Sequence, residues 1–174
     1  MFYALWPDAG THAEVAAIAA TVAAATGGRA PAAESLHLTL AFVGEIAAER
    51  LPALTAIGAR AAATVDAFTL HFDRVGTFRS SGIAWLGMGD APPALRALAD
   101  ALSLELAAGA FRTDRRAFHA HVTLARHCRR PPPASAAGTV TWPVRAMTLT
   151  ASLLEREGAR YRNLAVWPLG VKTP

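Results

Sequence analysis

The chain has 174 residues, of which 53% are hydrophobic, and its formal net charge is +4. This length suits one domain with its own core, so we expect residues 1–174 to form a single domain with two lobes. Cys128 is the only cysteine, which excludes an intramolecular disulfide and a zinc site made of several cysteines.

The first half of the chain predicts alternating strands and helices. The apolar run 2–6 is typical of a buried strand, and Thr11 with Glu14 fits a capping box that opens a helix ending at Gly27-Gly28. The segments that follow are predicted as a strand over 36–43, a helix over 47–63, a strand over 67–75 and a turn-rich connection over 76–82.

The second half repeats this order. Its predicted segments are a strand over 83–88, a helix from Pro92-Pro93 to 108, a strand over 118–126, an exposed loop at 129–133 and strands near 144–154 and 161–167. The interval from Trp6 to His37 is 31 residues, and that from Trp85 to His121 is 36. We infer a duplicated strand–helix–strand unit whose copies pack about a pseudo-twofold axis.

Each predicted unit ends on a His-x-Thr motif, His37-Leu38-Thr39 and His121-Val122-Thr123. Side chains alternate between the two faces of a strand, so the His and the Thr of each motif point the same way, and the residue between them points into the core. A pseudo-twofold axis would bring the two motifs to opposite sides of one cleft. The sequence therefore predicts a site built from two imidazoles and two hydroxyls.

Two histidines that face one cleft suit a substitution at phosphorus. A neutral imidazole can take a proton from an attacking water, and an imidazolium can donate one to the departing oxygen. An ordinary His pKa of about 6.5 allows both states near neutral pH. Thr39 and Thr123 can donate hydrogen bonds to the non-bridging oxygens. This scheme requires no metal, and the chain has neither a GxGxxG nor a Walker sequence, so we expect no cofactor.

The two motifs and their flanks resemble the 2H phosphoesterase superfamily. Within it the chain is similar to the LigT-like RNA 2′,3′-cyclic phosphodiesterases, also called 2′-5′ RNA ligases. The resemblance covers nearly the full length and is carried by residues 2–5, 36–44, 121–126 and 161–169. It implies an α+β, bilobal duplicated fold with two pseudo-symmetric lobes, each with an antiparallel sheet and flanking helices, and an active site in the central groove.

The resemblance also implies metal-independent hydrolysis of RNA or nucleotide 2′,3′-cyclic phosphate termini to a 2′-phosphate. Reversal of related chemistry would join RNA ends through a 2′-5′ bond. By position, His37 would be the proton donor to the 3′ oxygen and His121 the proton acceptor that activates water. Arg126 would contact phosphate, although strict alternation places it on the opposite face from Thr123. The expected partners are RNA ends or small cyclic nucleotides that carry a 2′,3′-cyclic phosphate.

Three neighbours of the motifs complete the predicted site. Phe42 has the strand parity of Leu38 and Leu40, which favours core packing over base stacking. Tyr161 is interpreted as a strand-edge aromatic residue rather than a base-stacking one. Many family members have proline directly before the second motif histidine, whereas this chain has His119-Ala120, and His119 shares the strand face of the motif.

Two alternatives remain open. A metallohydrolase could use His119 and His121 as a His-x-His pair, but a metal site needs further ligands, and no carboxylate-rich cluster lies near either motif in the sequence. A non-catalytic RNA-binding module with a basic groove would leave the paired motifs unexplained. The chain shows neither a signal-peptide pattern nor an apolar span long enough for a membrane, so we expect a cytoplasmic monomer without a membrane partner.

Overall fold

The structure is a computed structural model that describes the chain except residues 113–116, 134–137, 156–157 and 171–174. The helices are α1 (Ala9–Thr26), α2 (Leu51–Ala62) and α3 (Pro93–Ala108), with short 3-10 turns η1 (Ala33–Ser35), η2 (Ala48–Arg50) and η3 (Arg79–Ser81). The strands are β1 (Phe2–Leu5), β2 (Leu38–Phe42), β3 (Phe68–Phe72), β4 (Arg74–Phe78), β5 (Ile83–Gly87), β6 (His121–Ala125), β7 (Val140–Val144), β8 (Ala146–Glu155) and β9 (Gly158–Pro168). None of the helices described here is long and apolar enough to cross a membrane.

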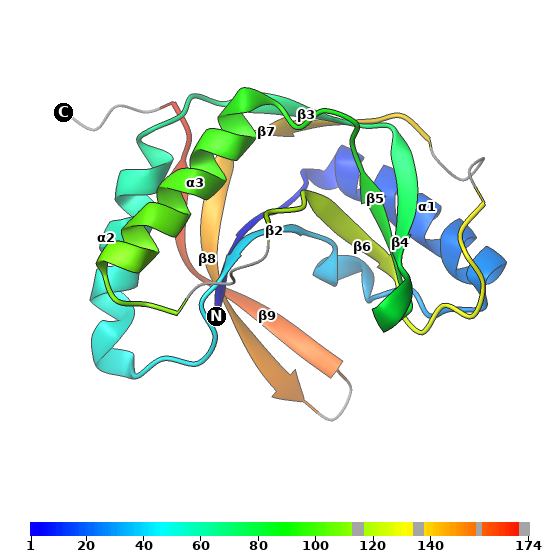
Figure 1. The fold of residues 1–174 in the computed structure, drawn as a ribbon, viewed down its shortest axis with the longest axis horizontal. Coiled ribbons are helices and arrows are strands. Elements are labelled where there is room, and N and C mark those ends of the chain that lie inside the picture. Colours follow the sequence, from blue (N-terminus) through cyan, green and yellow to red (C-terminus); the bar gives the residue numbers. More distant parts are fainter. Residues whose placement is uncertain (113–116, 134–137, 156–157, 171–174) are drawn as a thin grey trace.

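Two lobes meet at the centre of one antiparallel sheet (Figure 1). The sheet has the strand order β4-β5-β6-β2-β1-β8-β9, and β3 and β7 form a separate pair. Lobe A contains β2, β1, β8 and β9, and lobe B contains β4, β5 and β6. The lobes are joined where Leu38 of β2 pairs with Val122 of β6. The predicted fold class is therefore confirmed, and the two lobes share a continuous sheet at their boundary.

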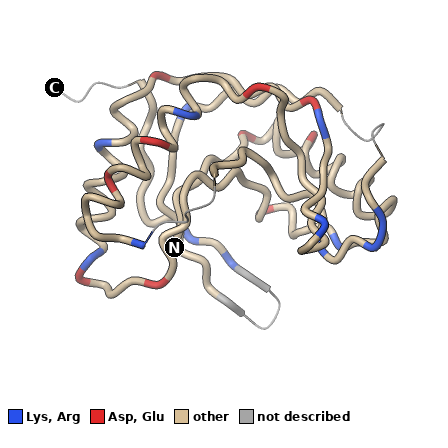
Figure 2. Tube along the Cα trace, in the orientation of Figure 1, with Lys and Arg blue, Asp and Glu red and all other residues tan. Residues whose placement is uncertain are grey.

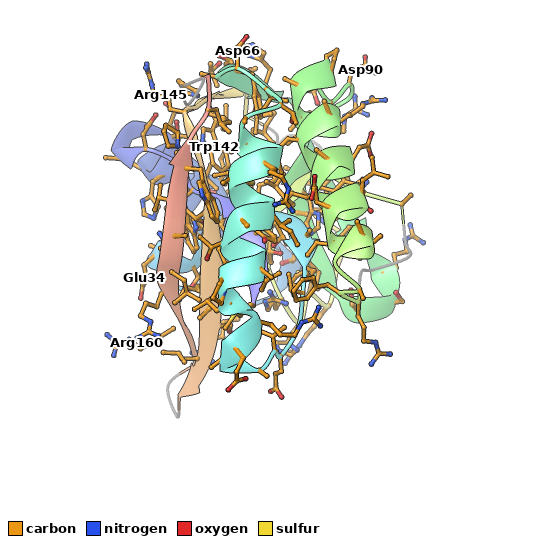
Figure 3. The ribbon with its side chains drawn as sticks, turned by 90° about the vertical axis from the view of Figure 1, so that its left-hand side faces the viewer. Glu34, Asp66, Asp90, Trp142, Arg145 and Arg160 are labelled. Atoms are coloured by element: carbon orange, nitrogen blue, oxygen red, sulfur yellow. The ribbon has the colours of Figure 1, made fainter. Side chains whose placement is uncertain are left out.

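The helices are exchanged between the two repeated units. In the sequence α1 connects β1 to β2, yet it packs on β6, and α3 connects β5 to β6, yet it packs on β2. Helix α2 packs beside α3 and against β8 and β9, an arrangement that Figure 3 shows from the side of lobe A. Each unit thus covers the motif strand of the other, so neither unit can bury its own sheet alone.

A single hydrophobic cluster runs through both lobes. It includes Leu38 and Val122 at the boundary, Leu102 from α3 and Val22 from α1, all nearly or fully buried. Complete burial of one such aliphatic side chain stabilises a fold by about 1.5–3 kcal/mol. Because the cluster is continuous across the boundary, packing fixes the position of one motif strand relative to the other.

The start of α1 differs from the predicted capping box. Asp8 is the N-cap, and its side chain accepts a hydrogen bond from the backbone N–H of Thr11 at 2.9 Å. Thr11 is buried, and its hydroxyl donates to the carbonyl of Thr141 instead. Aspartate caps a helix more strongly than threonine, which explains the earlier start. The helix ends as predicted, with Gly27 at a φ of 66° that glycine adopts without strain.

The segment predicted as one strand over 67–75 contains parts of two strands in different sheets. β3 pairs with β7, and β4 pairs with β5, with Asp73 between them. The prediction of a turn-rich connection over 76–82 is also wrong. Residues 76–78 belong to β4, and only the residues of η3 form a turn. The β7 strand was not predicted. It contains Pro143, which is tolerated because each strand of a two-stranded sheet has a free edge. Alternating hydrophobicity continues across Asp73 and cannot reveal a change of sheet.

Gly76 provides a test of how β4 and β5 pack. A Cβ atom at this position would clash with Cζ2 of Trp85, whose ring covers the glycine. We expect Gly76→Ala to lower the free energy of unfolding by about 1–3 kcal/mol, because the ring must move. The matched control is Gly10→Ala in the first turn of α1, where the nearest atom is 3.5 Å away. That variant should be neutral or more stable by up to about 1 kcal/mol in urea unfolding. Equal effects of both substitutions would contradict this packing.

Candidate active site

The motif side chains lie on one face of the sheet at the boundary between the lobes. Leu38 and Val122, the central residues of the two motifs, pair in antiparallel register and are buried. In such a register the flanking residues also face one another, so the His of each motif lies beside the Thr of the other. All four motif side chains are half-buried and line the same groove. The structure thus brings together the four residues that the sequence singled out.

The same backbone contact holds both motif histidines. Nδ1 of His37 lies 2.7 Å from the carbonyl oxygen of Ser35, and Nδ1 of His121 lies 2.7 Å from that of His119. In each case the carbonyl belongs to the residue two positions earlier. A carbonyl oxygen only accepts, so each Nδ1–H donates and each Nε2 is left for a ligand. Both imidazoles are therefore held in the tautomer that can exchange a proton through Nε2.

The groove between the lobes is larger than a typical small-molecule pocket. Its volume is about 1860 Å³, compared with roughly 300–1,000 Å³ for pockets that enclose drug-sized ligands. Arg29 and Arg126 line it together with the motif residues, and Glu34 and Asp100 are acidic side chains on its wall. A groove of this size has room for more than a single nucleotide.

Aromatic rings surround His37. The ring of Phe2 stacks on it at a centroid distance of 4.9 Å, and those of Trp6 and Tyr161 lie at 4.8 and 5.2 Å. This burial lowers the pKa of His37 below its ordinary value, and the hydrogen bond to Ser35 opposes the change. The positive charges of Arg126 and His121 lower the pKa further. At neutral pH these surroundings therefore favour a neutral His37.

His121 has a more polar environment. The ring of Phe78 meets it edge-on at 5.1 Å, and the ring of His119 lies at 5.7 Å. Burial again lowers the histidine pKa, the hydrogen bond to the carbonyl of His119 raises it, and the charges of His119 and Arg126 lower it. Arg126 thus acts on the pKa of both motif histidines, which shows that the two rings share one electrostatic environment.

A β-bulge in each motif strand determines what lies beside the histidines. The register shifts so that Leu40 is an extra residue in β2 opposite β1, and Leu124 is an extra residue in β6 opposite β5. Each leucine directly follows the motif threonine. An extra residue reverses strand parity beyond it, so Phe42 and Arg126, which occupy matching positions, turn toward the groove. This resolves the parity difficulty of Arg126, which lines the groove.

The core-packing prediction for Phe42 was wrong. Its side chain is 57% exposed and lines the groove, with its ring 6.0 Å from that of Phe2. The prediction failed because it counted alternation through Leu40, where the bulge lies. Tyr161 does lie on an edge strand, β9, and its ring also packs on His37. Arg160, its neighbour, points away from the helices in Figure 3 and lines the groove.

Sequence reasoning missed two aromatic residues of the site, Phe2 and Phe78. Phe2 lies in a uniformly apolar run, which gives no indication of which side chains face the core. Phe78 falls in the segment that was interpreted as a connection. The pairing of Phe2 with Phe42 in the neighbouring strand would have indicated that Phe2 belongs to the site. That register, however, can be read only from the folded sheet.

His119 lines the groove beside His121. Its ring lies 4.8 Å from that of Trp85 and 5.4 Å from that of Phe78. Among the residues that the structure describes, no group of three His, Cys, Asp or Glu side chains is placed to hold a metal ion. The His-x-His pair of the metallohydrolase alternative thus lacks a third protein ligand in the described part of the chain.

Comparison with known proteins gives one consistent family. Residues 7–160 match the model of the 2′-5′ RNA ligase superfamily. The chain is 39% identical to an RNA 2′,3′-cyclic phosphodiesterase of Escherichia coli over 82% of its own length and 80% of the relative's. It is 28% identical to a protein of the same name from Archaeoglobus fulgidus, over 96% and 98% of the two chains. The crystal structure of E. coli LigT complexed with 3′-AMP superposes with a TM-score of 0.86 and 33% identity, covering 98% of this chain and 97% of that one.

The effect of the Arg126 charge on both motif histidines can be tested by titrating the two imidazoles. Because its charge lowers the pKa of both motif histidines, we expect Arg126→Gln to raise both values toward the ordinary histidine pKa. The pKa values would be followed by NMR of the imidazole protons as the pH is lowered. Arg96→Gln, on the exposed start of α3, is the control and should leave both titrations unchanged. A shift of only one histidine in Arg126→Gln would show that the rings do not share this neighbour.

Proposed function

The chain belongs to the 2′-5′ RNA ligase superfamily, and from this premise we propose that it hydrolyses 2′,3′-cyclic phosphates at RNA or nucleotide ends to 2′-phosphates. The observation that carries the proposal is the pair of imidazoles in one groove, each with Nδ1 bonded to the backbone and Nε2 left for a ligand. Two relatives are named RNA 2′,3′-cyclic phosphodiesterases, and the similar structure of E. coli LigT is a complex with 3′-AMP, so both findings point to the same class of substrate.

The proposed reaction is an in-line substitution at the cyclic phosphorus. Nε2 of His121 takes a proton from water as the water oxygen bonds to phosphorus. The bond from phosphorus to the 3′ oxygen breaks, and Nε2 of protonated His37 gives its proton to that oxygen. The products are a 2′-phosphate and a free 3′ hydroxyl. The surroundings lower the pKa of both histidines, and the negative charge of a bound phosphate favours protonation of one of them.

The surroundings of His121 support its proposed role as the proton acceptor. The charge of neighbouring His119 lowers the pKa of His121, which favours the neutral form that a general base needs. His37, in contrast, is enclosed by the rings of Phe2, Trp6 and Tyr161. Because this enclosure lowers the pKa of His37, its protonated form depends on the negative charge of the bound phosphate.

Three further side chains would stabilise the phosphoryl oxygens. The hydroxyls of Thr39 and Thr123 lie on the same face as the histidines and can donate hydrogen bonds to the two non-bridging oxygens. Arg126 reaches the groove through the bulge at Leu124 and supplies a guanidinium. Donors held in place before the reaction stabilise charge as it builds up on these oxygens, and removal of one such donor typically costs a factor of about 10²–10³ in rate.

The reverse of related chemistry would join RNA ends. In that direction a 5′ hydroxyl, rather than water, would attack the cyclic phosphorus, and the 3′ oxygen would leave as before. The product would be a 2′-5′ bond. We include this ligation in the proposal because the same base and acid would serve either attacking hydroxyl.

The remaining expectations stay predictions from the sequence. These are a cytoplasmic location, a monomeric state and the absence of a cofactor. The single-domain interpretation of residues 1–174 has support from the one core cluster that crosses both lobes. The alternatives, an RNA-binding module and a metallohydrolase, differ from the proposal in turnover and in sensitivity to chelators.

The deciding experiment is an assay of an oligonucleotide with a 2′,3′-cyclic phosphate in excess EDTA. We expect turnover to a 2′-phosphate product, separated from the 3′-phosphate by chromatography. His37→Ala and His121→Ala should each reduce kcat by a factor of about 10²–10⁴ or more, because each removes one proton transfer. The matched control is His71→Ala, an exposed histidine of β3 outside the groove.

Three results would contradict the proposal. Near-normal rates in either motif variant would exclude the two-histidine mechanism. Loss of turnover with EDTA would favour the metallohydrolase, and RNA binding without turnover in the parent protein would favour the binding module. Thermal unfolding of each variant would show that the fold is retained.

Arg126→Ala tests the phosphate contact separately from proton transfer. The backbone of Arg126 is held by reciprocal hydrogen bonds with Arg29 at 2.8 and 2.9 Å, so removal of the side chain should leave the strand in place. We expect a higher KM, and a slope of log(kcat/KM) against log salt that is shallower by about 0.7, the share of one neutralised phosphate on a single strand. Arg96→Ala is the control. An unchanged KM and salt slope in Arg126→Ala would remove this residue from the site.

A further inference from the structure

Arginines gather at the end of lobe B, next to the groove. We define the arginine rim as Arg29, Arg79, Arg129 and Arg130, all of which are exposed. Arg29 follows α1, Arg79 lies in η3, and the other two follow β6. Figure 2 shows this end of the molecule, at the lower right, with basic segments close together and no acidic segment among the described residues there. Arg29 also lines the groove, and its backbone pairs with that of Arg126.

Backbone hydrogen bonds hold the rim segments together. Arg29 and Arg126 exchange both backbone hydrogen bonds, and the N–H groups of Arg129 and Arg130 both donate to the carbonyl of Thr26 at 3.0 and 3.1 Å. The N–H of Cys128 donates to the carbonyl of Gly82, directly after η3, at 2.9 Å. Three segments that are distant in the sequence are thus fixed side by side, and their side chains project from an ordered base.

The charge of the rim is not used in ion pairs within the described part of the chain. The ion pairs found there, Arg60 with Glu105 and Arg74 with Asp73, involve none of the rim arginines. The sequence agrees with this, because residues 115–154 contain six arginines and no Asp or Glu. The rim side chains are not needed to cap the carboxyl end of α1, because the backbone N–H groups of Arg129 and Arg130 already donate to the carbonyl of Thr26.

Resting on the proposed function, we propose that the arginine rim binds the phosphates of the nucleotides that precede the cyclic 3′ end. The terminal phosphate lies between the motif histidines, and the rest of the strand must leave the groove. Arg126 stands where the groove meets the rim, and the guanidinium fork suits phosphate oxygens. The groove volume, about 1860 Å³, also exceeds the need of one nucleotide.

The test is equilibrium binding of a fluorescent eight- to ten-nucleotide RNA that ends in a 2′-phosphate, which requires no turnover. Fluorescence anisotropy would be recorded between about 50 and 200 mM salt. For Arg129→Gln/Arg130→Gln we expect roughly tenfold weaker binding and a salt slope shallower by about 1.4, as for two phosphate contacts. Arg79→Gln, on a separate element, should reduce the slope by about 0.7. The matched control is Arg96→Gln/Arg145→Gln, which removes equal charge away from the rim.

A second measurement separates the rim from the reaction. Hydrolysis of a 2′,3′-cyclic mononucleotide should be the same in the rim variants and the parent, whereas KM for a cyclic-phosphate oligonucleotide should rise about tenfold. Equal losses for both substrates, or unchanged RNA binding, would overturn the rim proposal. A polyglutamate peptide that competes as well as RNA would also overturn it, in favour of an acidic protein partner. If the parent hydrolyses neither substrate, the proposed function fails, while the anisotropy result still decides whether the rim binds RNA.

Discussion

The pairing of Leu38 with Val122 is the contact on which the geometry of the site depends. It is the point where the sheets of the two lobes join, and each residue is the centre of a His-x-Thr motif. Because both are buried in one continuous core, the four polar motif side chains must share the opposite face. The same burial that stabilises the fold therefore positions the imidazoles and hydroxyls, and a slip of one residue in this register would turn all of them away from the groove.

The repeated units are similar in backbone and different in side chains. In each, the histidine is held through Nδ1 by a carbonyl two residues earlier, and the leucine after the threonine forms a bulge. The position that the bulge turns into the groove is Phe42 in one unit and Arg126 in the other. In one half of the groove the rings of Phe2, Trp6 and Tyr161 enclose His37, whereas in the other half Arg126 and His119 lie beside His121. A pseudo-symmetric scaffold in this way gives an asymmetric site, as two opposite proton transfers require.

Lobe B continues this asymmetry beyond the groove. The segments that follow α1 and β6 pair through Arg29 and Arg126, and the turn η3 is tied to them through Gly82 and Cys128. These contacts place basic side chains from three distant parts of the chain on one surface. The equivalent stretch of lobe A differs in sequence, because the strand after Leu40 leads to Phe42 and Gly44 rather than to a run of arginines.

The sequence by itself determined the motifs, most helices and strands, and the family, because these depend on local patterns: alternation in strands, proline at the start of α3, and glycine at the end of α1. It also determined that His and Thr of each motif share a face. The tertiary structure decided what depends on register and on pairing between distant segments. Alternation could not reveal the bulges that move Phe42 and Arg126, the division at Asp73 between two sheets, or the aromatic enclosure of His37 by Phe2, since each arises only when strands that are far apart in the chain lie side by side.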